Sequence, residues 1–129
     1  MSLRAHPLLR LLAPVALMAI TFWFSAQTYD GHEIAWWEVA GRNLGHFSGY
    51  ALLAAAWVWA LGGVSRRHLA LAAALSLAYA IADEYHQTFV EGRTGTWEDV
   101  VLDGLGIATA LLLIRRRGAS QTRGRENQA

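Results

Sequence analysis

Three runs of residues that are almost free of charge most constrain what this chain can fold into. They cover residues 11–26, 44–64 and 69–82 and consist mainly of Ala, Leu, Val and aromatic residues. A helix needs roughly 20 predominantly apolar residues to cross a bilayer, so these runs indicate membrane-spanning helices. At 129 residues the chain has room for one domain. We therefore expect an all-α integral membrane protein.

The distribution of arginine predicts an orientation. The chain has no lysine, and nine of its eleven arginines lie before the first run, between the second and third, or after the last span: Arg4, Arg10, Arg66, Arg67, Arg115, Arg116, Arg117, Arg123 and Arg125. Two acidic segments alternate with these groups and contain Asp30, Glu33 and Glu38, and Glu91 and Glu98. Because cytoplasmic loops are enriched in arginine, we expect a four-helix transmembrane bundle with both termini cytoplasmic. Orientation and anionic lipid explain the basic groups, so no nucleic-acid partner is predicted.

The predicted spans are about residues 8–26, 42–63, 68–90 and 97–114, which makes 1–117 one transmembrane domain. The polar stretch 118–129 is rich in small residues and is predicted to be a disordered cytoplasmic tail. The first span also resembles a signal peptide, although bulky Phe24 is unfavourable near a cleavage site at Ser25 and Ala26. Cleavage would leave three spans in the same orientation.

Polar residues interrupt the apolar segments at one predicted depth. The fourth span must reach back toward Trp97, because residues 104–114 are too few to cross a hydrocarbon core of about 30 Å. At 1.5 Å per residue from the predicted inner boundary, Asp103 lies about 18 Å up its helix, Asp83 about 22 Å and His46 about 26 Å. All three therefore fall in the outer leaflet.

Helical periodicity predicts which of these residues share a side of their helix. The groups are Asn43, His46 and Tyr50; Tyr79, Asp83, His86 and Gln87, with Glu84 at the margin; and Asp99 and Asp103. Since ionisable residues in lipid turn toward the bundle interior, we expect the three sides to converge, with Arg93 above the carboxylates. Gly41, Gly45 and Gly49 form a ridge typical of close helix packing.

The four carboxylates that converge are those of Asp83, Glu84, Asp99 and Asp103. They cannot all be ionised at low cost, so we expect at least one shared proton near neutral pH. That condition suits general acid–base chemistry. If the chain is an enzyme, Asp83 or Glu84 is the candidate base and His46 or His86 its proton partner. Arg93 is either a clamp for an anion or a structural partner for Asp99. Asp99 is alternatively a helix cap beside Thr96.

A metal site is a further alternative, because His46, Glu84, His86 and Asp99 are suitable ligand types. The spacing matches no HExxH motif, and the prediction is that the chain has no metal or other cofactor.

Three separated motifs resemble the VanZ-like family. They lie in "GRNLGHFSGYALL" and "DEYHQTFVEGRTGTWEDVVLDGLG", within residues 42–106. The resemblance implies functional positions at Arg42, His46, Tyr50, Asp83, Glu84, His86, Gln87, Gly92, Arg93, Asp99 and Gly106. Two departures are Asp103, where the family usually has Asn, and Glu91, where it usually has Pro.

What the resemblance implies is a small multi-pass protein of the bacterial cytoplasmic (inner) membrane, in a family named for low-level teicoplanin resistance. The expected partner is a membrane lipid or a lipid-linked envelope precursor, bound or modified in an outer-leaflet pocket. Gln87, Asp99, Asp103, Tyr50 and Arg42 join Arg93 as candidate binding residues. Two alternatives stay open: a non-catalytic scaffold or lipid-binding module whose polar cluster is structural, and a small proton-coupled transporter.

Overall fold

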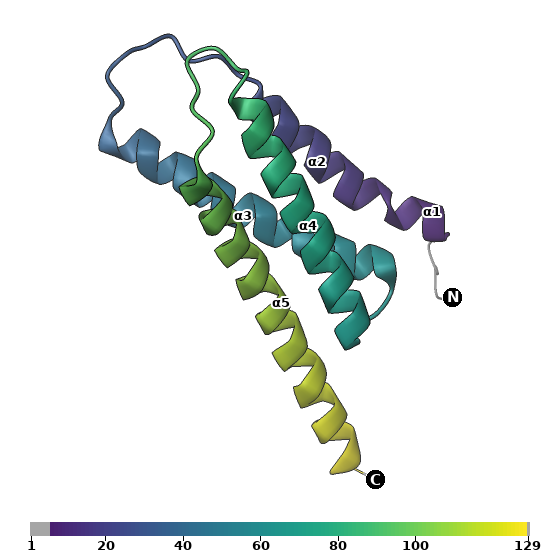
Figure 1. The fold of residues 1–129 in the computed structure, drawn as a ribbon. Helices are drawn as coiled ribbons and strands as arrows, with labels where there is room; N and C mark the ends of the chain where they lie inside the picture. The colour runs from purple at the N-terminus through teal and green to yellow at the C-terminus, as the bar shows by residue number, and fades with distance from the viewer. Residues whose placement is uncertain (1–5, 129) are drawn as a thin grey trace.

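The computed structural model describes residues 6–128 and is built from helices (Figure 1). Their bounds are α1 (Pro7–Arg10), α2 (Leu12–Ser25), α3 (Trp36–Leu61), α4 (Arg66–Gln87) and α5 (Trp97–Glu126). Because α1 and α2 together form one apolar segment, Pro7–Ser25, the structure confirms the all-α prediction with four helices. Arg4, in the first arginine group, lies outside the described residues.

The loop between α2 and α3, which carries Asp30 and Glu33, and the loop between α4 and α5, which carries Glu91, lie together at one end of the bundle (Figure 1). The backbone N–H of Tyr29 donates to the carbonyl of Glu91, with 3.2 Å between N and O. Gly92 has a positive φ of 76°, and a Cβ there would lie 2.4 Å from the Tyr29 carbonyl oxygen. Glycine is therefore required where the loops meet. The side of the membrane that this end faces stays a prediction.

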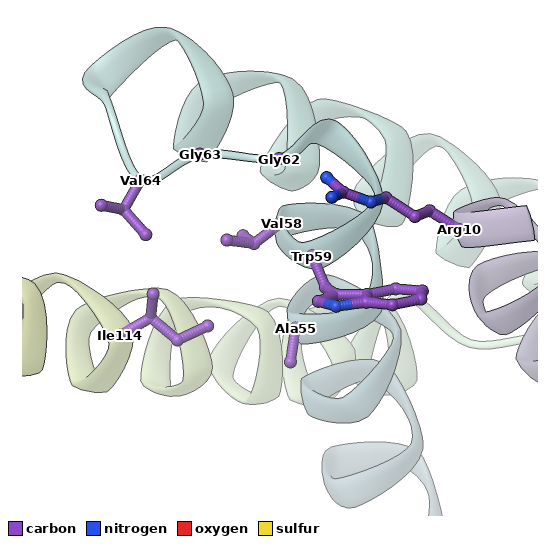
Figure 2. A pocket seen from close by; sticks show the side chains of 8 residues that line it. All are labelled: Arg10, Ala55, Val58, Trp59, Gly62, Gly63, Val64 and Ile114. Carbon is purple, nitrogen blue, oxygen red and sulfur yellow. The ribbon is translucent and has the colours of Figure 1, made fainter. Parts of the chain in front are cut away.

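The opposite end contains the turn between α3 and α4. Gly62 ends α3 with φ 78°, and a Cβ there would lie 2.9 Å from Arg10 Nη1. The Arg10 guanidinium lies 6.0 Å from the centroid of the Trp59 ring, a cation–π geometry. Figure 2 shows these side chains around a cavity of about 440 Å³ whose other lining residues, Ala55, Val58, Gly63, Val64 and Ile114, are apolar.

The bundle buries several polar residues beside its apolar core and exposes many apolar residues. Its buried side chains include six polar or acidic residues of α4 and α5: Ser76, Asp83, Glu84, Gln87, Asp99 and Asp103. The exposed surfaces of the same helices carry Leu71, Leu75, Ile81, Val101 and Leu105. This distribution is typical of a bundle in lipid, where polar groups must be satisfied internally.

Within residues 6–128, two helical segments are long and apolar enough to cross a membrane, Pro7–Ser25 and Trp36–Leu61. The acids described above make α4 and α5 more polar than these two. The prediction of four spans is therefore supported for two of them by length and composition, and α4 and α5 stay predicted spans.

Helix ends differ from the predicted spans by three residues or more at three places. α3 begins at Trp36 instead of residue 42, because the Glu38 carboxylate accepts from the Ala35 N–H at 2.8 Å and caps the first turn. α4 ends at Gln87 instead of residue 90. α5 continues to Glu126, so the predicted disordered tail is helical up to that residue. Its Ala, Arg and Gln residues favour helix, and basic residues in the last turn suit the helix dipole.

Candidate functional site

A histidine–carboxylate pair joins α3 to α5. The two helices approach closely at Gly106, where a Cβ would lie 2.2 Å from the Phe47 carbonyl oxygen. One turn away from Gly106 on α5, Asp103 Oδ1 lies 2.8 Å from His46 Nδ1. Asp103 is fully buried. With the carboxylate ionised, Nδ1 carries the proton and donates it, which leaves Nε2 as the basic nitrogen of the ring.

Glu84 of α4 lies against this pair. Its Oε1 is 3.9 Å from His46 Nδ1 and 3.4 Å from Gln87 Nε2, which donates to it. Its Oε2 accepts from the backbone N–H of Thr96 at 3.1 Å. The loop can come this close because residue 95 is glycine, since a Cβ there would lie 2.2 Å from the Glu84 carbonyl oxygen. Glu84 thus joins α4 to the start of α5.

Asp99, in the first turn of α5, completes a buried cluster with His46, Glu84 and Asp103. Its backbone N–H donates to Thr96 Oγ1 at 3.4 Å, so Thr96 is the cap of α5 and Asp99 is not. The Asp99 carboxylate, Glu84 and His46 each offer a ligand atom within 4.8 Å of one another. These are three of the four residues considered above as metal ligands.

Asp83 lies one residue before Glu84 and pairs with α3. Its Oδ2 accepts from the Tyr50 hydroxyl at 3.1 Å. Within residues 6–128 its Oδ1 is buried without a hydrogen-bond partner, as is Asp103 Oδ2. Buried polar atoms are normally paired, so two of the carboxylates keep free hydrogen-bonding capacity.

A cavity of about 670 Å³ adjoins these residues between α2, α3 and α4. This volume is within the roughly 300–1,000 Å³ of small-molecule sites. Six of the predicted site residues line it: Arg42, His46, Tyr50, Asp83, Gln87 and Arg93. Glu84, Asp99 and Asp103 do not line it and lie close to His46 instead. One end of the cavity is therefore polar and backed by acids.

His86 and Arg93 lie differently from the expected arrangement. The His86 ring packs on Phe22 of α2, with 4.7 Å between centroids. In the described part of the chain no hydrogen bond joins it to the acids, and its Nδ1 is buried without a partner. Arg93 lines the cavity, but its Nε and Nη2 donate to the carbonyls of Gln27 and Phe24, at 3.1 and 3.2 Å. It therefore holds the end of α2 as well as facing the cavity.

The glycine ridge of α3 has a different place from the predicted helix contact. Gly41, Gly45 and Gly49 line the cavity. A Cβ added at Gly41 or Gly45 would meet nothing within 4 Å, and one at Gly49 would meet only Thr21 Cγ2, at 3.8 Å. The ridge thus borders open space, and the packing interpretation is wrong for its first two glycines. Each of the three glycines directly precedes a site residue in the sequence. This adjacency could have predicted that the glycines border the site.

Comparison with known proteins identifies a family. The family model VanZ/LLP1 matches residues 10–118, a range that includes every residue of the cluster and the cavity. No curated protein and no solved structure matches the chain.

Proposed function

We propose that this chain, which belongs to the VanZ/LLP1 family, binds or modifies a lipid-linked component of the bacterial cell envelope in the cavity between α2, α3 and α4. The polar end of the cavity lies in the outer leaflet of the cytoplasmic membrane in this proposal. Binding of an envelope precursor there raises tolerance to glycopeptides such as teicoplanin. The observation that carries the proposal is a cavity with one apolar and one polar part, inside a bundle whose outer surface is apolar.

The His46–Asp103 pair supplies acid–base chemistry at the polar end. The Asp103 carboxylate orients the ring through Nδ1, and Nε2 makes no hydrogen bond among residues 6–128 and is not buried. His46 also lines the cavity. A ring held in this way accepts or donates a proton at Nε2, which suits modification of a hydroxyl or phosphate ester as well as its binding.

A structural lock is the second candidate, and specific contacts favour it. Glu84 joins α4 to the backbone of Thr96, and Asp83 joins α4 to Tyr50 of α3. A lock is expected to pair every buried polar atom. Asp83 lines the cavity, and its Oδ1, which has no hydrogen-bond partner within residues 6–128, therefore favours a ligand site. A proton-coupled transporter is a third candidate, yet α5 continues below Asp103 through residues 106–114 with Thr109 as its only polar side chain.

Lipid retention tests the proposal. The full-length protein and a His46→Gln variant are purified in mild detergent, and co-purifying lipids are quantified by mass spectrometry. Glu91→Gln, in the exposed loop, is the control because it removes an acid outside the cluster. We expect wild type and Glu91→Gln to retain a lipid that His46→Gln retains less, with equal helicity in all three. Equal lipid profiles would contradict the proposal.

A further inference from the structure

We propose that the ligand enters sideways from the bilayer and that its hydrocarbon chain lies along a groove over Gly41, Gly45 and Gly49, with an anionic head group beside Arg42 and Arg93. This inference rests on the proposed function and adds the ligand class and its orientation. The groove is the part of the cavity between α2 and the glycine ridge of α3.

The walls of the groove suit a hydrocarbon chain. α2 contributes Leu17, Ile20 and Phe24, and α3 contributes Leu52 beyond the ridge. Ile20 is 52% and Phe24 60% exposed, so these side chains line the cavity and also face outward, where a membrane would supply lipid. Because the two glycines nearest the polar end have open space above them, a chain can lie directly on the α3 backbone.

Two buried polar atoms in the same cavity point independently to a ligand. Ser25 is 4% and Asp83 5% exposed, and both line the cavity. In the described residues neither Ser25 Oγ nor Asp83 Oδ1 has a hydrogen-bond partner. A hydroxyl can donate to a phosphate oxygen, and the free carboxylate oxygen can accept from a head-group hydroxyl. A head group with both a phosphate and a hydroxyl satisfies these two atoms.

The charges around the cavity favour a negative head group. Arg42 and Arg93 are its cationic lining residues, and Asp83 is its acidic one. The Asp83 carboxylate already accepts from Tyr50. The other three acids lie behind His46, which bonds to Asp103. A head group with a net negative charge is therefore favoured over a zwitterionic one: guanidinium groups bind the phosphate oxygens of both, but the two arginines repel the cation that a zwitterionic head group adds.

Filling the groove tests the inference with a matched control. Gly45→Leu places a side chain in the groove, where a Cβ meets nothing within 4 Å. Gly104→Leu makes the same exchange on α5, also where a Cβ meets nothing and outside the cavity lining. Leucine is a better helix former than glycine, so both variants should fold.

The full-length protein in lipid nanodiscs is exposed to phosphatidylglycerol or phosphatidylcholine with a photoreactive group in the acyl chain, and labelled peptides are mapped. We expect phosphatidylglycerol to label α2 and α3 in wild type and Gly104→Leu, and Gly45→Leu to reduce this labelling about tenfold, or about 1.4 kcal/mol. Phosphatidylcholine should label these helices several-fold less.

Equal labelling of the two glycine variants overturns the groove, and equal labelling by the two lipids overturns the head-group assignment. Lipid retention that depends on His46 but not on Gly45 overturns this inference alone and leaves the proposed function standing. Retention that depends on neither residue contradicts both.

Discussion

Replacing Asp103 separates two roles of its carboxylate: orienting His46 and supplying a negative charge. Asp103→Asn keeps an oxygen that can accept from His46 Nδ1, which lies 2.8 Å from Oδ1. Because the acceptor loses its charge, this hydrogen bond weakens by about 1 kcal/mol, the difference between charged and neutral hydrogen bonds. Removing a fully buried charge from beside other carboxylates opposes that loss. We expect the free energy of unfolding to change by less than about 1 kcal/mol.

Asp103→Leu removes the acceptor altogether. The Nδ1–H group then has no partner at its place between α3 and α5, which costs about 1–3 kcal/mol. Unfolding of the purified variants by SDS in mixed micelles, followed by tryptophan fluorescence, measures both changes. Lipid retention should be kept in the Asn variant, because His46 keeps its tautomer. Should Asn destabilise the protein as much as Leu, the charge of Asp103 and not its hydrogen bond would hold the pair, which refutes this reasoning. Asp103→Asn also introduces the residue that is usual at this position in the VanZ-like pattern.

Three further predictions concern packing, pH and topology. Gly106→Ala should lower the free energy of unfolding by about 1–3 kcal/mol, because the new Cβ would lie 2.2 Å from the Phe47 carbonyl oxygen. Gly104→Ala is the control and should not destabilise the protein, because its Cβ meets nothing within 4 Å. Equal melting temperatures of the two variants would refute the close approach of α3 and α5. The pKa of the His32 ring should lie above its ordinary 6.5, because hydrogen bonds to Asp30 and then to Glu38 raise it. The stabilisation of the loop by these contacts is thus fully present below pH 6.5 and is lost as the pH rises through the raised pKa. An NMR titration in which Asp30→Asn leaves the pKa of His32 unchanged would contradict the assignment. Because the chain has no cysteine, Glu33→Cys should react with an impermeant maleimide in intact spheroplasts and Ser120→Cys only after lysis; the reverse pattern would invert the proposed topology.

Convergence of the polar residues could be predicted because helix rise and lipid together leave few alternatives. Asp103 of α5 and His46 of α3 lie 57 positions apart in the sequence. Counting depth at a fixed rise per residue predicts both in the outer leaflet, within about 8 Å of each other, and the cost of charge in lipid turns both inward. The structure brings them into contact.

The neighbours of each residue could not be predicted in the same way. Periodicity puts Asp83 and His86 on one side of α4, but the pairing of helices decides that Asp83 meets Tyr50 of α3 and His86 meets Phe22 of α2. The glycine ridge posed the same difficulty. Small residues allow close packing or leave open space, and only the position of α2 shows that Gly41 and Gly45 border a cavity.

The cap at the start of α3 was missed for a local reason. Glu38 reads as one of several loop acids, and Ala35 has no side chain that could serve as a cap. The capping contact runs from the Glu38 carboxylate back to the Ala35 N–H, which needs the first turn of the helix to be formed already. Composition alone does not reveal it.

The most direct test of a functional role for the buried cluster is teicoplanin tolerance of cells that express wild type, Glu84→Gln or Glu91→Gln, with membrane abundance measured on the same samples. Glutamine keeps an oxygen that can accept from the Thr96 N–H but removes the charge next to His46. We expect wild type and Glu91→Gln to raise tolerance and Glu84→Gln to lose it at equal abundance. Tolerance retained by Glu84→Gln, or lost only in step with abundance, would contradict the account and favour a structural lock.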